Sequence, residues 1–487
     1  MSALKLCIVS SEMVPFSKTG GLADVAGALA RQLAAAGHEV RAFVPLYSSI
    51  RSGFTELFPV PQAQDISIPV GVDRIEFSLR QMPAGPAGLT VYFVDCPVMF
   101  DRPSLYTNDS DEHRRFILFT RACIEACQYL AFSPDIFHCN DWHTAFLPLF
   151  LQTVYAWDRL FSGSRTVLTI HNIGYQGEFS SISVADLALG PSQARLHQDD
   201  LKAGFINPLK HGIMYADAVT TVSPTYAVEI RNSSLGMGMQ DALAQRRDPV
   251  VGILNGVDYE EWDPRHDKQL TTHYHSADLR GKLKNKQRLI AHSRLKFADT
   301  VPIVSMVTRL AEQKGVDLLF DSLPSLLRDR LFGLIVLGSG EDRYVAFFRK
   351  LLTDFPGQVA FHGGYDEQLA HLIEAGSDIF LMPSRYEPCG LNQMYSLRYG
   401  TIPVVRKTGG LADSVQHFDP ATGTGTGVVF EHYDAPAVSW ALNTALDWYT
   451  DQRTWRRIMR NAMAQDFSWQ HQVVEYEHLY RRMTGLT

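Results

Sequence analysis

The heptapeptide KTGGLAD occurs twice in the chain, at residues 18–24 and again at residues 407–413. The first copy follows a short apolar run at 4–10, and the second follows another at 401–405. Adjacent glycines between a strand and a helix let backbone N–H groups approach an anion, and the helix N-terminus adds partial positive charge. A single Gly-Gly pair also marks ordinary turns. Two copies, one near each end, predict two similar half-molecules that face one ligand.

Size and composition indicate a globular enzyme of two large domains. The chain has 487 residues, of which 46% are hydrophobic and 20% are charged. A net charge of -7 at pH 7 argues against a general nucleic-acid-binding or anionic-membrane surface, although a local basic cleft is compatible with it. No apolar stretch is long enough to span a bilayer. We therefore expect neither a nucleic-acid nor a membrane partner, and no feature indicates an oligomeric state.

The cysteines indicate a reducing compartment. They are scattered and lie mostly in apolar runs, which favours free thiols in a cytoplasmic protein over a disulfide framework. The first apolar run is too short for the hydrophobic region of a signal peptide and is followed by Glu12, so we expect it to form a strand. The six cysteines are Cys7, Cys96, Cys123, Cys127, Cys139 and Cys389.

Short apolar runs alternate with helical patterns in two series. Helical periodicity is clear at 116–130 and at 201–215. This alternation predicts mostly parallel, doubly wound sheets with helices on both faces, and it places a ligand beyond the C-terminal ends of the strands, in the cleft between two domains. The expected strands are 4–10, 39–44, 89–94, 135–138, 166–170, 218–222 and 250–254 in the first series, and 302–307, 333–337, 358–361, 378–382, 401–405 and 427–430 in the second.

The boundary between the two series lies near LNGVD at 254–258, after which the chain becomes polar. We predict an N-terminal Rossmann-like domain at 1–255 and a C-terminal Rossmann-like domain at 256–465. The last segment, 466–487, is predicted to be a helix, because apolar side chains from Val473 to Met483 recur on one helical face.

Polar residues follow the strand expected at 135–138. Asp141 is suited to capping the next helix, and His143 to its first turn. His138, Cys139 and His143 together could also bind a metal, although structural zinc usually has four convergent ligands. Asp109-Ser110-Asp111 resembles the short acid pairs that hold a divalent metal in some sugar transferases, but acids are also favoured before a helix.

Arg309 and Lys314 follow the strand expected at 302–307. They could be solvated surface charges. Two cations at a strand-to-helix junction are also a means of binding a diphosphate, because arginine offers a forked donor and lysine a point charge.

Glu387 lies in the loop PSRYEPCGL, residues 383–391, after the strand expected at 378–382. It could be an ordinary acid near a helix N-terminus, or a carboxylate that accepts hydroxyl groups of a sugar. Cys389 could act as a nucleophile, but no neighbouring base is evident to activate it.

These motifs together resemble bacterial glycogen synthase and plant starch synthase. The resemblance rests on KTGGLADV at 18–25, NDWH at 140–143, His171-Asn172 with Tyr175-Gln176-Gly177, LNGVD at 254–258, RLAEQKG at 309–315, PSRYEPCGL at 383–391, the second KTGGLAD and DFSWQ at 466–470. It covers nearly the whole chain in the same order. It implies a retaining GT-B glycosyltransferase that moves glucose from ADP-glucose to the non-reducing end of an α-1,4-glucan (glycogen), and a C-terminal helix that crosses back to the N-terminal domain.

The resemblance also implies roles for individual residues. Arg309 and Lys314 would neutralise the departing diphosphate. Glu387, His143 and Asp111 would be catalytic, and the last two would line the sugar side. The remaining residues would bind substrate: Lys18, Gly20, Gly21 and Asp24 from the first loop, Asn255, the segment Cys389, Gly390 and Leu391, and Thr408, Gly409 and Gly410, whose N–H groups would contact the distal phosphate. No metal and no pyridoxal phosphate cofactor is implied.

The chain departs from the related families at two positions. Many retaining GT-B enzymes have a second glutamate eight residues after the first, where this chain has Tyr395. The glycogen synthase branch tolerates that change. Asp111 is followed by glutamate, whereas many relatives have asparagine there.

The expected reaction breaks a glycosyl–phosphate bond through an oxocarbenium-like state. The resemblance places only Glu387 well, and no acid is an obvious nucleophile on the opposite face of the sugar. We therefore expect a front-face mechanism in which the leaving phosphate helps to deprotonate the acceptor hydroxyl.

Several other functions are compatible with parts of the sequence. An α-glucan phosphorylase would need a lysine that binds pyridoxal phosphate, and none is marked. An NAD-dependent oxidoreductase would need Gly-x-Gly-x-x-Gly after the first strand. A non-catalytic glucan-binding protein could use Trp157, Trp262 or Trp448 but would not account for two glycine loops. A UDP-glucose donor, a small-sugar acceptor, and enzymes similar to sucrose-phosphate synthase or trehalose-forming transferases are the nearest alternatives.

Overall fold

A computed structural model of the chain describes residues 2–54, 56–82, 85, 88–232 and 234–485. They form two compact units. Unit 1 comprises Met1–Val222, Ala227–Gly256 and Trp469–Thr487, and unit 2 comprises Ser223–Tyr226 and Val257–Ser468. The sequence predicted boundaries after residues 255 and 465, whereas the chain passes between units after Gly256 and after Ser468. The short segment Ser223–Tyr226 was not expected in unit 2.

The sheet of unit 1 has the strand order β12-β11-β8-β7-β1-β2-β6-β5-β3, with β4 paired to β5. From β12 to β6 all neighbours are parallel, and β5 pairs antiparallel with β6, β4 and β3. Because β2 and β7 flank β1 on opposite sides, the chain changes direction across the sheet between β1 and β7. The strands are β1 (Lys5–Val9), β2 (Glu39–Pro45), β3 (Phe58–Pro59), β4 (Ile66–Val70), β5 (Asp73–Gln81), β6 (Leu89–Asp95), β7 (Ile136–Asn140), β8 (Arg165–Ile170), β11 (Ala218–Thr221) and β12 (Val251–Gly252); β9 (Phe179–Ser180) and β10 (Phe205–Ile206) form a separate pair.

The sheet of unit 2 is parallel throughout, with the order β15-β14-β13-β16-β17-β18. The chain changes direction here between β13 and β16. Both units are therefore doubly wound, as the alternating pattern predicts, and the apolar runs that form the parallel strands are buried. The strands are β13 (Ile303–Val307), β14 (Gly333–Gly338), β15 (Val359–Gly363), β16 (Ile379–Met382), β17 (Ile402–Arg406) and β18 (Val428–Phe430).

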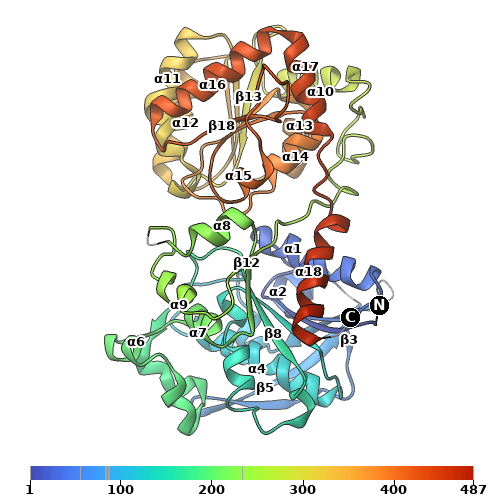
Figure 1. Cartoon of the computed structure of the whole chain (residues 1–487), viewed down its shortest axis with the longest axis vertical. Helices are drawn as coiled ribbons and strands as arrows, with labels where there is room; N and C mark the ends of the chain where they lie inside the picture. The colour runs from blue at the N-terminus through green and yellow to red at the C-terminus, as the bar shows by residue number, and fades with distance from the viewer. Residues whose placement is uncertain (1, 55, 83–84, 86–87, 233, 486–487) are drawn as a thin grey trace. The chain divides into compact units, whose positions relative to one another are not determined.

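Helices connect the strands in both units (Figure 1). Those numbered up to α9 are α1 (Gly21–Ala35), α2 (Ser48–Gly53), α3 (Pro97–Phe100), α4 (Glu112–Tyr129), α5 (Leu147–Leu151), α6 (Gln198–Ala203), α7 (Pro208–Tyr215), α8 (Pro224–Glu229) and α9 (Gln240–Ala244). The others are α10 (Arg280–His292), α11 (Leu319–Asp329), α12 (Asp342–Asp354), α13 (Glu367–Gly376), α14 (Asn392–Tyr399), α15 (Gly409–Ser414), α16 (Ala435–Thr450), α17 (Gln452–Met463) and α18 (Trp469–Thr484).

The C-terminal helix α18 belongs to unit 1, as the resemblance implied, and lies beside α1 (Figure 1). Its apolar face is buried through Val473, Tyr476 and Tyr480. The Tyr480 hydroxyl lies 2.6 Å from His138 Nδ1, and Glu477 Oε1 lies 2.8 Å from His38 Nε2. Helix α18 thus packs against elements from the beginning of the chain.

Two local predictions differ from the structure. The helix expected at 201–215 is two helices, because Gly204 takes a left-handed conformation (φ +94°) that ends α6, and Asn207 with Pro208 starts α7. The antiparallel edge β3–β5 was not predicted. Its longest strand, β5, is only partly buried, so it lacks the continuous apolar run that marks the central strands.

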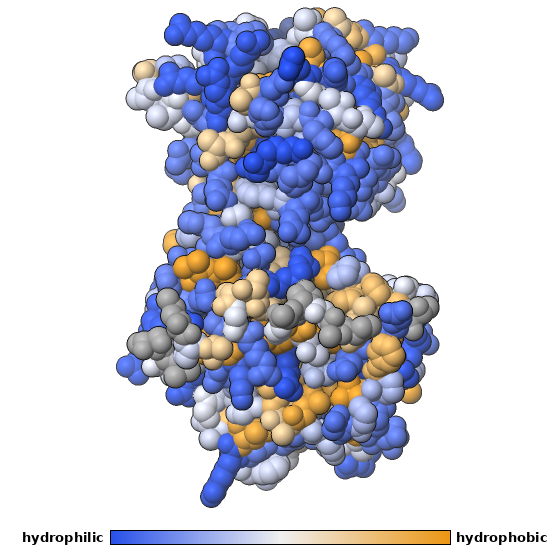
Figure 2. All heavy atoms as spheres, turned by 90° about the vertical axis from the view of Figure 1, so that its right-hand side faces the viewer, coloured by the Kyte–Doolittle hydropathy of each residue, from blue (hydrophilic) through white to orange (hydrophobic). Residues whose placement is uncertain are grey.

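The surface differs between the units on the face drawn in Figure 2. Unit 2 is mostly hydrophilic there, and hydrophobic residues gather in patches on unit 1. Among the helices that the structure describes, none combines the length and the apolar character needed to cross a membrane.

Candidate active site

In unit 2 the predicted site residues come together at the change of chain direction between β13 and β16. Arg309 and Lys314 follow β13, Glu387 follows β16, and Thr408 follows the neighbouring strand β17. Carboxyl ends of adjacent parallel strands meet at one edge, and in open α/β sheets this is where ligands bind.

Lys314 and Glu387 form an ion pair in this cluster. Lys314 Nζ lies 2.7 Å from Glu387 Oε2, and the Ser384 hydroxyl donates to the same oxygen at 2.9 Å. The Glu387 side chain is almost fully buried, and that of Lys314 is 18% exposed. Arg309 is exposed and close to Gln313, whose own side-chain amide donates to the Tyr386 carbonyl. The two loops therefore hold a partly accessible ammonium group against a buried carboxylate.

Glycines allow these loops to pack backbone to backbone. A Cβ atom on Gly315 would lie 2.0 Å from the Pro383 carbonyl oxygen, and one on Gly410 would lie 2.1 Å from that of Cys389. Gly409 has φ +43°, and its Cβ would lie 1.9 Å from the Glu387 carbonyl oxygen. The second KTGGLAD copy thus supports the loop that carries Glu387.

The sequence predicted that N–H groups of this second copy would bind a phosphate, but the structure shows one of them bonded to the protein backbone. The N–H of Gly410 donates to the carbonyls of Glu387 (3.1 Å) and Pro388 (3.2 Å). It is therefore occupied within the protein, and not open to an anion as the sequence predicted. The helix that follows, α15, has only six residues, against the fifteen of α1 after the first copy.

The segment 389–391 is held by the next helix. Gly390 has φ +70°, and Gln393 Nε2 donates to the carbonyls of Cys389 and Gly390 at 3.0 Å each. The Leu391 carbonyl accepts the N–H groups of Met394 and Tyr395 in α14. Thr408 is buried beside this loop, and its carbonyl accepts from Leu411. These contacts fix the backbone that the resemblance assigns to sugar binding.

In unit 1 the first KTGGLAD copy makes different contacts. Thr19 donates through its hydroxyl (3.0 and 3.1 Å) and through its backbone N–H to the Glu12 carboxylate, and the N–H of Gly20 also donates there. Lys18 Nζ lies 2.8 Å from Asp24 Oδ1. A carboxylate of the chain therefore fills the position in which a glycine loop would hold an anion, and burial raises the pKa of Glu12.

Glu12 is a site residue that the sequence did not reveal. Its only signal is an acid between the end of β1 and the lysine loop. The same carboxylate would repel a phosphate at the Thr19 and Gly20 N–H groups, so Lys18, half-exposed, is the cation of this loop that is accessible to an anionic ligand.

The loop after β7 places Asp141 and His143 in a buried polar cluster. Asp141 has φ +54°, and its Oδ1 accepts the His171 N–H at 2.7 Å. The His143 ring stacks on Trp142 and Tyr106 with centroids 4.1 and 4.7 Å away. His143 Nδ1 is buried without a hydrogen-bond partner among the described residues. Burial, with the charge of Arg115, holds the pKa of His143 well below its usual value, so its imidazole is neutral at pH 7.

Burial raises the pKa of Asp141 to about 7, even though the His171 and Asn172 N–H groups oppose the shift. The folded state therefore favours the protonated acid, and this stabilisation is complete below pH 3.8 and is lost as pH rises to about 7. We expect Asp141→Asn, which keeps a carbonyl acceptor for His171, to flatten the fall of unfolding free energy between pH 4 and pH 7. Urea unfolding at a series of pH values measures this pH dependence. If the unfolding free energies of variant and parent ran parallel against pH, the prediction would be refuted.

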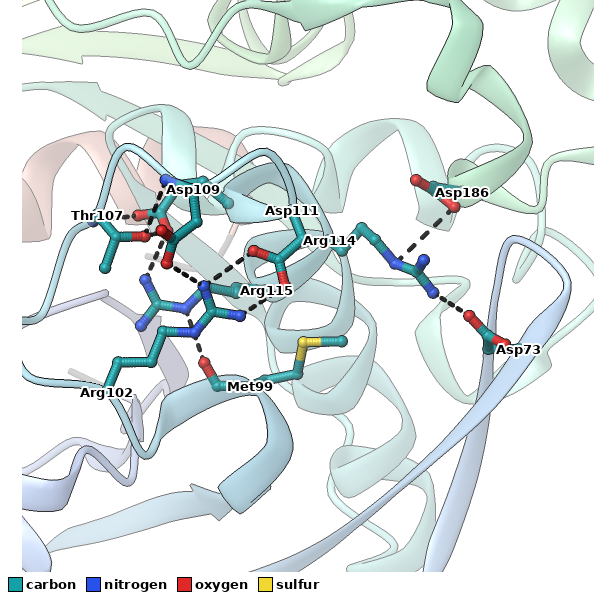
Figure 3. A network of polar contacts seen from close by, with 10 residues as sticks. Asp73, Met99, Arg102, Thr107, Asp109, Asp111, Arg114, Arg115 and Asp186 are labelled. Carbon is teal, nitrogen blue, oxygen red and sulfur yellow. Dashed lines mark hydrogen bonds and ion pairs between the residues drawn. The ribbon is translucent and has the colours of Figure 1, made fainter.

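Asp111 is paired with Arg102, and this pairing competes with the expected role of Asp111 on the sugar side of the site (Figure 3). Arg102 holds its two oxygens at 2.9 and 2.5 Å, and also reaches Asp109 at 2.6 Å. This pairing lowers the pKa of Asp111. Asp109 and Asp111 therefore share an arginine, which is an arrangement suited to positioning the start of α4 and unlike an open metal-binding acid pair.

Two further predictions concern His138 and Asn255. Both ring nitrogens of His138 are engaged, one with the Tyr480 hydroxyl and the other with Thr169 Oγ1, each at 2.6 Å. The alternative of a metal held by His138, Cys139 and His143 is therefore not supported. Asn255 is buried at the end of unit 1, and its Oδ1 has no hydrogen-bond partner among the residues that the structure describes.

Known protein families and known proteins resemble the chain over most of its length. Residues 5–245 match the family described as starch synthase catalytic domain, and residues 287–462 match glycosyl transferases group 1. A glycogen synthase from Koribacter versatilis (strain Ellin345) is 43% identical over 483 residues, which cover 98% of each chain. A glycogen synthase from Desulforudis audaxviator (strain MP104C) is 43% identical over 98% of this chain and 96% of its own.

Solved structures show the same architecture. The catalytic domain of starch synthase IV from Arabidopsis thaliana, bound to ADP and acarbose, superposes with a TM-score of 0.90 at 33% identity and covers 99% of this chain and 100% of its own. Sucrose-phosphate synthase from Thermosynechococcus elongatus, at 18% identity and a TM-score of 0.62, shares the fold. Two doubly wound domains of this kind constitute the GT-B fold. The chain belongs to the glycogen synthase family and is a glycosyltransferase.

Proposed function

We propose that this chain transfers glucose from ADP-glucose to the non-reducing end of an α-1,4-glucan with retention of configuration, and releases ADP. The observation that carries this proposal is the Lys314–Glu387 pair at the strand ends of unit 2. Support for the donor comes from the starch synthase IV structure, whose bound nucleotide is ADP. We further propose that the reaction takes place in the cytoplasm, since the six cysteines are buried free thiols.

In this proposal the cations act on the leaving group. Negative charge grows on the diphosphate as the glycosyl bond breaks, so a preorganised ammonium or guanidinium stabilises the transition state more than the ground state. Lys314 and Arg309 of unit 2 supply these charges. We propose as well that Lys18 binds the donor. We propose that neither a metal ion nor pyridoxal phosphate takes part in the transfer.

Glu387 has a different role. Its side chain is buried, so a sugar hydroxyl that donates to it would be fixed in a site with little water. Lys314 and Ser384 already orient its Oε2, which leaves Oε1 as the acceptor for such a hydroxyl. We propose that Glu387 positions the glucose and that the leaving phosphate takes the proton of the acceptor hydroxyl at the front face.

The test of donor and acceptor is the incorporation of labelled glucose into glycogen from ADP-glucose and, in parallel, from UDP-glucose, without added metal. We expect transfer from ADP-glucose that is lost in Glu387→Ala and Lys18→Ala. Lys350→Ala is the control, because Lys350 is an exposed lysine on α12 paired only with Asp354 among the described residues.

Any of three results would overturn a part of the proposal. Transfer from UDP-glucose alone would refute the donor. Absence of transfer from both donors, with activity on small sugars or sugar phosphates, would refute the acceptor. A stable glucosyl–protein adduct formed with a fluorinated donor would refute the front-face mechanism.

A further inference from the structure

Three side chains in unit 2 form a cluster that the transfer reaction does not use. A ring nitrogen of His371 and one carboxylate oxygen each of Glu261 and Glu367 lie within 4.8 Å of one another. Glu367 and His371 are four residues apart on α13, so they occupy one face of that helix. Glu261 comes from the polar segment that follows the start of unit 2. We call these residues the Glu261 cluster.

The histidine of this cluster is buried and oriented. Its side chain is 1% exposed, and Nδ1 lies 2.8 Å from Oδ2 of Asp267, which is fully buried. Trp262 stacks on the imidazole with ring centroids 3.7 Å apart, and stacks also on Tyr395 at 4.0 Å. The ring is thus clamped in one position by a carboxylate and an indole.

The second ring nitrogen has no such partner. His371 Nε2 is buried and makes no hydrogen bond within the described part of the chain. Asp267 also accepts hydrogen bonds from the Tyr399 hydroxyl (2.6 Å) and from the Gln269 N–H (2.8 Å), which hold its carboxylate against His371. Because Asp267 engages Nδ1, Nε2 is the ring nitrogen that remains for a ligand.

A buried polar nitrogen without a partner costs free energy, and the groups of the cluster beside it are carboxylates. A divalent cation could bind the nitrogen together with the two carboxylates. Histidines that bind metals commonly donate their other ring N–H to a carboxylate, which is the relation of His371 to Asp267.

We propose that His371, Glu261 and Glu367 bind one divalent transition-metal ion, with Zn²⁺ the best match to one imidazole and two carboxylates, and that Asp267 positions the histidine. Ligand atoms bound to one Zn²⁺ lie roughly 3.3 Å apart, as bonds of about 2.0–2.1 Å require. Both glutamates are exposed, so their side chains can close from the present separation without disturbing the core.

The ion links two parts of unit 2 that are distant in sequence. Glu261 and Trp262 lie just after the chain enters unit 2, and α13 precedes β16, which leads into the Glu387 loop. The site is therefore structural. The ion would connect the segment of Glu261 and Trp262 to helix α13. Metal binding is therefore expected to stabilise the folded protein.

The test uses the full-length protein after dialysis against a chelator. Titration with Zn²⁺ and with Co²⁺, followed by calorimetry and by visible absorption of bound Co²⁺, is expected to show one tight site per chain. The thermal unfolding midpoint should rise when Zn²⁺ is added. Glu261→Gln and Glu367→Gln should each weaken binding at least tenfold and abolish the rise in the midpoint.

Glu260→Gln is the matched control, because Glu260 is an exposed acid next to Glu261 that is outside the cluster. It should bind as the parent does. Both glutamine variants keep side-chain size and avoid the buried histidine, so misfolding should not obscure the result. Absence of a tight site in the parent, or equal binding in Glu367→Gln and Glu260→Gln, would overturn the proposal.

Discussion

Lys314→Ala is expected to lower kcat by a factor of about a hundred to a thousand, the usual cost of removing one preorganised charge from a developing anion. Lys314 Nζ lies 2.7 Å from Glu387 and remains partly accessible. Its charge can therefore reach a diphosphate while the buried carboxylate holds it in place. Arg309 is more exposed, and the charge of an exposed side chain is screened by water more strongly than that of a partly buried one. The measurement is the initial rate of glucose transfer at saturating donor.

Loss of stability has to be separated from loss of catalysis in this variant, because removing Lys314 leaves Glu387 buried with only Ser384 as its side-chain partner among the described contacts. The thermal midpoint of the variant should be measured beside kcat. The exposed Lys350→Ala is again the matched control and should keep kcat within about twofold. A kcat for Lys314→Ala within threefold of the parent, in a folded protein, would remove Lys314 from the mechanism.

The parallel strands of both units were predictable because each is a continuous apolar run. All thirteen expected runs correspond to strands in the structure. The antiparallel edge was not predictable in this way, since β4 and β5 bury only part of each strand. The helix expected at 201–215 failed because apolar periodicity continued across Gly204, whose left-handed conformation ends one helix before Pro208 starts the next. Local backbone chemistry outweighed the hydrophobic pattern there.

The composition of the unit 2 site could be predicted, but its pairings could not. Sequence placed Lys314 and Glu387 each at the end of a strand. Their ion pair depends on β13 and β16 being neighbours, which is a property of the sheet order. Glu12 was missed for a different reason, because its contact with Thr19 is made within a loop whose path the sequence does not define. Tyr395, which stands where the wider enzyme group has a second glutamate, stacks on Trp262.

The two copies of KTGGLAD have the same sequence but different surroundings in the structure. Gly20 and Gly409 occupy the same position in the repeat. A Cβ on Gly20 would meet nothing within 4 Å, and its φ of -158° is open to any residue. A Cβ on Gly409 would lie 1.9 Å from the Glu387 carbonyl oxygen, at φ +43°. The same substitution should therefore have very different consequences at the two sites.

We expect Gly409→Ala to reduce the free energy of unfolding by about 2 kcal/mol or more, since a left-handed non-glycine residue alone costs roughly 1–2 kcal/mol and the clash adds to it. It should also abolish most transfer activity, because the carbonyl that must move belongs to Glu387. Gly20→Ala should change the unfolding free energy by no more than about 0.5 kcal/mol. Calorimetric unfolding and transfer assays on both variants measure this. Equal stability of the two would mean that the Glu387 loop yields to the methyl group, and that its backbone is not the rigid support inferred for the site.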